Sequence, residues 1–203
     1  MYRINPITKK MARVCMSIVG LLFLPLAAHS ADVLHSSVTK QNGRYMMHIE
    51  TVVQAPVSKV HSLLMDYKNF TSFNSIFKQV ELVKRLDDGE IRMGVRSEFC
   101  ILAICQHFDW IQDVQFRPDG DISINIVPNQ GDFRQGNGRW RLLSVDGGTR
   151  LLFDLDLTPK YWIPSVFGTW LVQQKLSEDA FKFAQELERM AISNGCYSIY
   201  KIC

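Results

Sequence analysis

The sequence predicts an α+β domain in which an antiparallel β-sheet packs against one long C-terminal α-helix. Between residues 76 and 157, apolar and polar residues alternate with a period of two, and short turn signals such as DDG and RPDG separate the runs. Residues 176–191 instead place apolar side chains about every 3.6 residues, the spacing of one helix face. A sheet with one apolar face needs a second layer, and this helix supplies it.

The first 30 residues predict a secretory signal peptide. Residues 1–14 contain four basic residues and no acidic one, and an apolar run follows from residue 16 to residue 28. Ala28 and Ser30 fit the small-residue positions of a cleavage site. The apolar run is short for a membrane span of about 20 residues, although an uncleaved anchor is the alternative. We therefore expect residues 1–30 to be a signal peptide, cleaved near Ser30, and the protein to be periplasmic.

Residues 31–203 are expected to form a single domain, with a core at about residues 45–192 and a cysteine-containing C-terminal tail. Removing the four bases of the leader from the 23 of the chain leaves 19 bases against 20 acids, so the domain carries a net charge of −1. Because runs of like charge are also absent from the sequence, we expect no nucleic-acid partner.

The N-terminal part of the domain predicts two strands followed by a helix. RYMMHIETVV, residues 44–53, alternates with a period of two, and the preceding QNGR is a turn that links it to a shorter strand at residues 33–39. Ala55-Pro56 ends the strand, and proline suits the first turn of a helix. Apolar residues at helical spacing mark one side of that helix: Val57, Val60, Leu63 and Leu64.

Six further strands and the long helix complete the expected order. The strands are expected at residues 77–86, 90–99, 106–116, 121–127, 132–145 and 149–157. The long helix follows, and Asn194-Gly195 supplies its C-terminal stop. Its charged residues are expected on the face away from the sheet: Lys175, Glu178, Asp179, Lys182, Glu186 and Arg189.

One segment carries a resemblance to a known superfamily. VVQAPVSKVHSLLMDYKNF, residues 52–70, resembles the opening V-x-A-P-x-x-x-V-x-x-x-L-x-D-Y segment of the START-like, or SRPBCC helix-grip, superfamily. GNGRWRL (136–142), GTRLLFDLDLTP (148–159) and the terminal helix extend the resemblance over about residues 45–192. The superfamily includes polyketide cyclases and the coenzyme Q-binding Coq10 group, and this chain would be an exported member.

The resemblance implies a curved antiparallel β-sheet wrapped around a long C-terminal α-helix, with a cavity for a hydrophobic ligand between them. We expect the ligand to be a lipid or quinone-like molecule, and we expect no cofactor, metal or catalytic residue. Phe153 on an apolar strand face and Phe183 on the helix stripe are predicted to point into this space. Plain core packing is the alternative role for such aromatic residues. The full set of cavity-lining candidates is Trp110, Phe153, Trp162, Trp170 and Phe183.

The segment FCILAIC offers three interpretations. Cys100 and Cys105 could join His107 as metal ligands, but a structural zinc site normally has four. A Cys–His nucleophile would need an activated thiolate and an orienting third group. The favoured interpretation is a disulfide across the base of a hairpin whose loop is residues 101–104, since opposed residues in a ladder have Cα atoms about 4.5 to 5.5 Å apart. Cys196 and Cys203 would form a second disulfide, although four cysteines allow three connectivities.

Two rival functions remain open at this point. A cyclase- or hydrolase-type enzyme would need a polar cluster inside the cavity, for which Asp109, Asp113 and His107 are loose candidates. A protein-interaction module would have a filled core and no cavity. For a carrier, the loop tip formed by Ile101, Leu102 and Ile104 is expected to touch a membrane or a partner protein transiently. Arginines at period two are expected on a solvated sheet face, with recognition of an anionic ligand as the alternative: Arg92, Arg96, Arg139 and Arg141.

Overall fold

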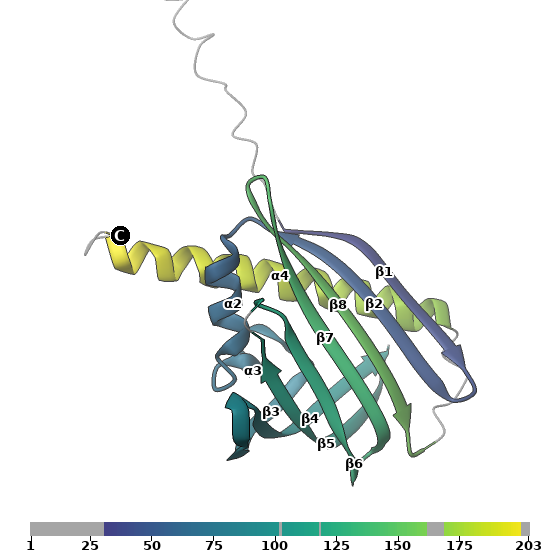
Figure 1. Ribbon diagram of the computed structural model, residues 1–203. Coiled ribbons are helices and arrows are strands. Elements are labelled where there is room, and N and C mark those ends of the chain that lie inside the picture. The colour runs from purple at the N-terminus through teal and green to yellow at the C-terminus, as the bar shows by residue number, and fades with distance from the viewer. Residues whose placement is uncertain (1–30, 102, 118, 162–168, 200–203) are drawn as a thin grey trace, which may run out of the picture.

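Eight antiparallel strands form one strongly curved sheet, and a long helix lies against its concave side (Figure 1). The structure is a computed structural model that describes residues 31–101, 103–117, 119–161 and 169–199. The strands are β1 (Asp32–Gln41), β2 (Arg44–Val53), β3 (Phe77–Arg85), β4 (Ile91–Ile101), β5 (Ile104–Phe116), β6 (Ile122–Gly131), β7 (Phe133–Val145) and β8 (Gly148–Pro159). The helices are α2 (Val57–Met65), α3 (Phe70–Phe73), the short 3-10 helix η2 (Asp87–Gly89) and α4 (Thr169–Ile199). The α+β fold class expected from the alternation is confirmed.

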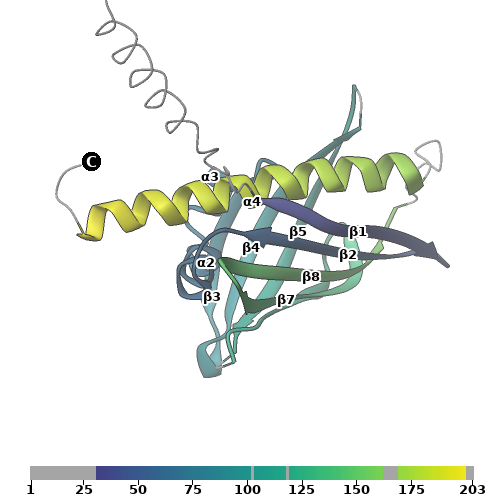
Figure 2. The same cartoon turned by 90° about the horizontal axis from the view of Figure 1, so that it is seen from above.

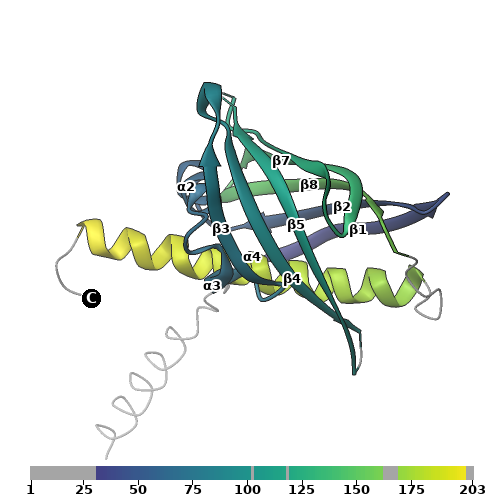
Figure 3. The ribbon, with the colours of Figure 1, turned by 90° about the horizontal axis from the view of Figure 1, so that it is seen from below.

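The order of the strands in the sheet is β1-β2-β8-β7-β6-β5-β4-β3. Strands that follow one another in the chain are therefore neighbours in the sheet, with one exception. β2 pairs with β8, the last strand in the chain, instead of with β3. Figure 2 shows α4 running next to β1, and Figure 3 shows β4 crossing the same helix from the opposite arm of the sheet. The sheet thus curls around α4, which is the helix-grip arrangement that the resemblance implied.

The first hairpin depends on two residues with positive φ. Asn42 and Gly43 have φ angles of 52° and 77°, and they connect the paired residues Gln41 and Arg44. Two successive positive φ angles form the turn type that matches the twist of a tight antiparallel hairpin, and Asn-Gly is its preferred sequence. The turn that the sequence QNGR predicted between these two strands is therefore confirmed.

The compact core lies at one end of the concave side, where α2 and α4 meet the sheet. Val60 of α2, Leu187 of α4 and Leu151 of β8 are almost completely buried there. The core is reinforced by two polar links. The Thr149 hydroxyl donates to the carbonyl oxygen of Ala55 at 2.6 Å, and the backbone N–H of Gln54 donates to Glu188 Oε2 at 2.8 Å. The Gln54–Glu188 bond ties the C-terminal half of α4 to the segment after β2, and the Thr149–Ala55 bond ties that segment to β8.

Two expectations about element ends need correction. The strands β4 and β5 extend to Ile101 and Ile104, so the hairpin has a two-residue connection instead of the four-residue loop expected. Isoleucines favour extended strands, and they continue the ladder. Helix α4 does not stop at Asn194-Gly195 but runs through it to Ile199. A glycine inside a helix costs only about 1 kcal/mol, and a long helix tolerates it.

Among the helices that the structure describes, none combines the length and the apolar character that a membrane span requires.

Candidate functional site

A cavity of about 480 Å³ lies between the concave face of the sheet and α4. Its walls are built by the alternation of the strands, since every second residue points to the concave side. On β2, Met47 and Ile49 line the cavity, and their register partners Leu155 and Phe153 on β8 line it beside them. The same rule applies to β5 and β6, where the lining residues include Trp110, Val114, Phe116, Ile122, Ile124 and Ile126. The site is therefore a predominantly apolar chamber.

Aromatic rings connect the sheet to the helix across one side of this chamber. The Trp140 and Phe153 rings stack with centroids 4.2 Å apart, and Phe183 of α4 lies 5.5 Å from Trp140. A second group lies in the other arm of the sheet, where the Trp110 ring is 5.5 Å from Phe133 and 6.1 Å from Phe77. Such flat rings provide a surface against which a planar or branched apolar ligand can pack.

Two glycines on β7, Gly136 and Gly138, allow large neighbouring side chains to pack closely over that strand. Gly136 pairs with Ile126 on one side and Leu157 on the other, and Gly138 pairs with Ile124 and Leu155. A Cβ atom at Gly136 would stand 2.7 Å from Leu157 Cδ2 and 2.8 Å from Ile126 Cδ1. The large neighbours therefore occupy the space that side chains at these two positions would take.

The structure places three of the five predicted lining residues, Trp110, Phe153 and Phe183, in the wall of the cavity. Trp162 lies outside the described residues. Trp170 is not part of the wall, and it is 70% exposed at the start of α4. The helix explains this difference, because the lining face contains Val172 and Leu176. Trp170 stands two residues, or about 200°, from Val172 and so on the opposite side.

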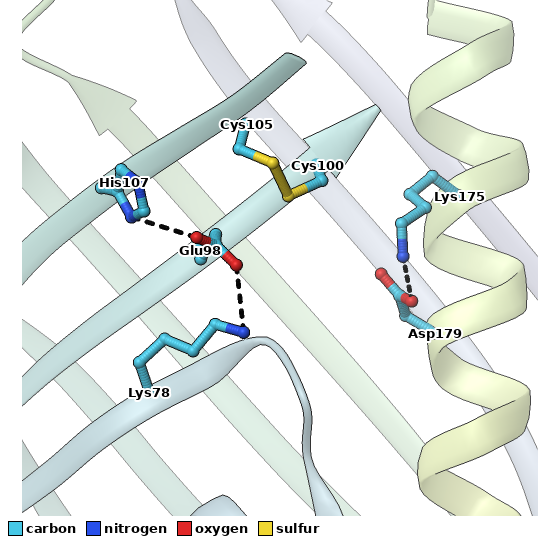
Figure 4. Close-up of a disulfide and its surroundings, with 7 residues drawn as sticks. All are labelled: Lys78, Glu98, Cys100, Cys105, His107, Lys175 and Asp179. Carbon is cyan, nitrogen blue, oxygen red and sulfur yellow. Dashed lines mark hydrogen bonds and ion pairs between the residues drawn. A yellow bond between two sulfur atoms is a disulfide. The ribbon is translucent and has the colours of Figure 1, made fainter. Parts of the chain in front are cut away.

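The expected placement of Asp179 on the solvated face of the helix is wrong. Asp179 lines the cavity, between Leu176 and Phe183 on the same helix face, and its side chain is only 5% exposed. Lys175, one turn earlier, forms an ion pair with its Oδ1. Within the described part of the chain, no group donates a hydrogen bond to the buried Oδ2. Figure 4 shows the two side chains pointing toward one another from successive turns of α4.

Other polar groups are sparse in the wall. The buried hydroxyl residues Thr51 and Ser97 line the cavity, and the Trp110 indole N–H donates to Gln112 Oε1 at 2.8 Å. Of these positions, only Trp110 was singled out from the sequence, whereas Thr51, Ser97 and Gln112 were not. The strand alternation did indicate their face, but only the fold shows that this face borders a cavity.

The candidate acids of the enzyme interpretation point away from the cavity. Asp109 accepts from Arg96 Nε at 2.8 Å, and Asp113 accepts from Arg92 Nε at 2.6 Å, both on the outer face of the sheet. This face carries further ion pairs: Arg44–Asp156, Arg139–Asp121, Arg141–Asp154 and Arg150–Glu50. The four arginines at period two are thus engaged on the solvated face, and they do not reach into the cavity.

The cysteine hairpin also places its sulfur atoms on the outer face. Cys100 and Cys105 are register partners with Cα atoms 4.0 Å apart, and their Sγ atoms lie at the bonding distance of 2.08 Å (Figure 4). Glu98 lies next to them and is contacted by Lys78 Nζ at 3.0 Å and His107 Nδ1 at 3.6 Å. Glu98 and the two sulfurs form the group of possible metal ligands in the described region, but bonded sulfurs offer no thiolate. Cys196 and Cys203 were expected to form a second disulfide with each other, and neither side chain is among those that the structure describes.

Comparisons with known proteins extend this picture. No curated protein matches the chain. A START superfamily protein from Mycobacterium smegmatis has a similar solved structure, with 21% identity, a TM-score of 0.57, and coverage of 73% of this chain and 98% of that one. A STAR-related lipid transfer protein from Xanthomonas axonopodis gives 18% identity, a TM-score of 0.54, and coverage of 77% and 98%. The Zhui aromatase/cyclase from Streptomyces sp. R1128 gives 14% identity, a TM-score of 0.51, and coverage of 77% and 97%.

These structural likenesses show the fold alone, whereas a family model gives membership. The model of the family described as "Polyketide cyclase / dehydrase and lipid transport" matches residues 53–180, from the end of β2 into the cavity face of α4. This match spans more than half of the 203 residues. The chain therefore belongs to the polyketide cyclase / dehydrase and lipid transport family and has its START-like fold.

Proposed function

We propose that the protein binds a hydrophobic small molecule, a lipid or quinone-like compound, in the cavity between the sheet and α4, and carries it. The cavity of about 480 Å³ is the observation that supports this proposal most directly. Its volume falls within the range of about 300 to 1,000 Å³ that is typical of small-molecule sites, and its lining is mostly apolar. Burial of apolar ligand surface would supply the affinity.

The placement of the three candidate catalytic residues Asp109, Asp113 and His107 favours a carrier over a cyclase. An acid–base enzyme needs groups within hydrogen-bond reach of the reacting atoms. Asp109 and Asp113 are paired on the outer face, and His107 is mostly exposed at the rim. The family description and the solved structures include both lipid transfer and aromatase/cyclase proteins, so fold alone does not decide between these roles.

Titration with N-phenyl-1-naphthylamine, a neutral fluorophore that brightens in apolar surroundings, tests the proposal. Wild-type protein should bind it saturably, at about one molecule per chain. Ala180→Phe should remove most of this binding, because Ala180 is a buried small residue in the cavity wall. Lys182→Phe is the matched control, since it adds the same side chain on an exposed position of the same helix and should bind normally.

Two results would contradict the proposal. One is the absence of saturable binding to folded wild-type protein. The other is equal binding by the Ala180→Phe variant, because the fluorophore would then occupy a different site. Native mass spectrometry of protein from its own host, followed by solvent extraction, would identify the class of any ligand that copurifies.

We further propose that the β4–β5 hairpin touches a membrane during transfer. Both Ile101 and Ile104 line the cavity, but Ile104 is 60% exposed at the end of the hairpin, whereas Ile101, also expected at the surface, is buried. Leu102 lies outside the described residues. Ile104→Ser should lower the fraction of protein that floats with phosphatidylglycerol-containing liposomes, while Val83→Ser, at another exposed apolar position, should leave it unchanged. Equal flotation of both variants and wild type would exclude this role for Ile104.

A further inference from the structure

The Asp179 carboxylate is the least expected group in the cavity wall. It stands on α4 among Leu176, Ala180 and Phe183, all of which line the same chamber. Among the residues that the structure describes, Lys175 is the partner of Oδ1, through its ammonium group. The second oxygen, Oδ2, is buried, and it accepts no hydrogen bond from any described residue. Buried polar atoms are nearly always hydrogen-bonded, so an orphaned one at the border of a cavity calls for a partner from outside the protein.

The charge state of the site restricts what that partner is. Lys175 already balances the negative charge of Asp179, so the pair is neutral as a unit. A second cation would leave one positive charge without a counterion in an apolar chamber, which is strongly unfavourable. An anionic head group, such as a fatty-acid carboxylate, would be repelled by Oδ2, which offers only lone pairs. A neutral hydrogen-bond donor satisfies the oxygen without either penalty.

We propose that Asp179 Oδ2 accepts a hydrogen bond from a neutral hydroxyl group of the ligand, and so selects apolar molecules that carry an alcohol or phenol. This proposal rests on the proposed function, and it names the class of ligand within it. The apolar walls hold the body of the molecule. Asp179 determines which polar end is accepted and how that end is oriented.

Displacement of bound N-phenyl-1-naphthylamine by four compounds of equal chain length tests this selection. The compounds are dodecanol, methyl dodecanoate, dodecanoate and dodecylammonium, each used below its aggregation threshold. Dodecanol should displace the fluorophore at about tenfold lower concentration than the methyl ester. The reason is that a hydrogen bond to a charged acceptor raises the affinity by roughly a factor of ten. Dodecanoate should be the weakest competitor of the four.

Two variants separate the role of Asp179 from general damage to the cavity. The double variant Lys175→Met, Asp179→Leu replaces the ion pair with apolar side chains of similar size, a change that buried pairs commonly tolerate. It should lose the tenfold preference for dodecanol over the methyl ester, a ratio that a change in overall affinity leaves unaltered. The single variant Lys175→Met leaves the carboxylate without its counterion, so its preference should move toward dodecylammonium.

The possible outcomes distinguish the two proposals. If neither the fluorophore nor any of the four compounds binds, the proposed function fails. If all four bind but dodecanol has no advantage over the ester, or if the advantage persists in the folded double variant, only the role of Asp179 is overturned. In that case the carboxylate oxygen is satisfied by water, and the ligand is selected by shape alone.

Discussion

At the residue scale, the outer face of the sheet is organised by paired charges. Asp154 on β8 lies between two partners, His48 Nδ1 at 2.6 Å and Arg141 Nη2 at 2.9 Å. Burial raises the pKa of Asp154, but the hydrogen bonds with His48 and Arg141 outweigh that effect and hold the pKa below its ordinary value of 3.8. The ionised form of Asp154 is therefore favoured by folding.

Because of this lowered pKa, Asp154 should stabilise the protein less at acidic pH than at neutral pH. Because the pKa of Asp154 is lower in the folded state, its contribution is present above pH 3.8 and is lost as the pH falls through the folded value. Asp154→Asn should lower the free energy of unfolding near neutral pH by up to about 1 kcal/mol, since the side chain is 44% exposed and solvent screens the pair. Urea titrations should show the gap between variant and wild type closing as the pH falls below the ordinary pKa of 3.8. A gap independent of pH would indicate a packing effect.

Individual residues also mark the limit of what the sequence predicts. Asp179 occupies a position of the apolar helix stripe, three residues after Leu176 and four before Phe183, yet its charge suggested the solvated face. Its burial depends on the Lys175 ion pair and on the depth of the cavity, and neither can be read from the chain. Phe153 and Phe183 were predictable, because strand and helix periodicity both turn them toward the space between the two layers.

At the scale of single elements, the β4–β5 hairpin has the clearest division between its two faces. Ser97, Phe99 and Ile101 point into the cavity, while Glu98 and Cys100 point outward. The expected opposition of Cys100 and Cys105 is found in the register, although the connection is shorter than expected. Turn length depends on where the ladder stops, and the apolar residues at 101 and 104 are compatible with either strand or loop.

Removing the crosslink should loosen this hairpin. A disulfide that closes a loop of this size is expected to stabilise the fold by about 2 kcal/mol through the chain entropy of the unfolded state. The Cys100→Ser, Cys105→Ser variant should therefore unfold at lower urea concentration than oxidised wild type, and reduced wild type should behave as the variant does. Peptide mass spectrometry after alkylation should show the 100–105 segment protected until reductant is added. Alkylation of both cysteines in unreduced, folded protein would contradict the bond.

At the scale of the whole molecule, the fold was more predictable than the cavity. Alternation predicted the strands and their inward faces, helical spacing predicted α4, and the resemblance implied that the sheet curves around the helix. The pairing of β2 with β8 was not predicted. The same pattern is compatible with a filled core. The difference arises from how far α4 stands from the sheet and from small lining residues such as Ala180, which leave space among large ones.

The seam between α4 and β1 provides the simplest route into this space. Near the N-terminal end of α4, the contacts with β1 include polar ones: the hydroxyls of Ser36 and Ser177 are hydrogen-bonded, and Gln173 Nε2 donates to the carbonyl oxygen of Ser36 at 2.9 Å. The C-terminal half of the helix is instead anchored in the apolar core through Ala184 and Leu187. We therefore expect the N-terminal half to move away from β1 when a ligand enters or leaves.

A reversible tether across the seam tests this movement. Cysteines at positions 36 and 177 should form a disulfide on oxidation, because the hydroxyl groups they replace are in direct contact. The oxidised Ser36→Cys, Ser177→Cys variant should release N-phenyl-1-naphthylamine at least about tenfold more slowly than the reduced form, since opening that costs a further 1.4 kcal/mol is tenfold slower. Ser36→Cys alone controls for the substitution and should respond to neither oxidant nor reductant. Equal release rates in the two redox states, measured by stopped-flow dilution, would place the ligand's path elsewhere, and the rim at His107 and Ile104 would then be the next position to tether.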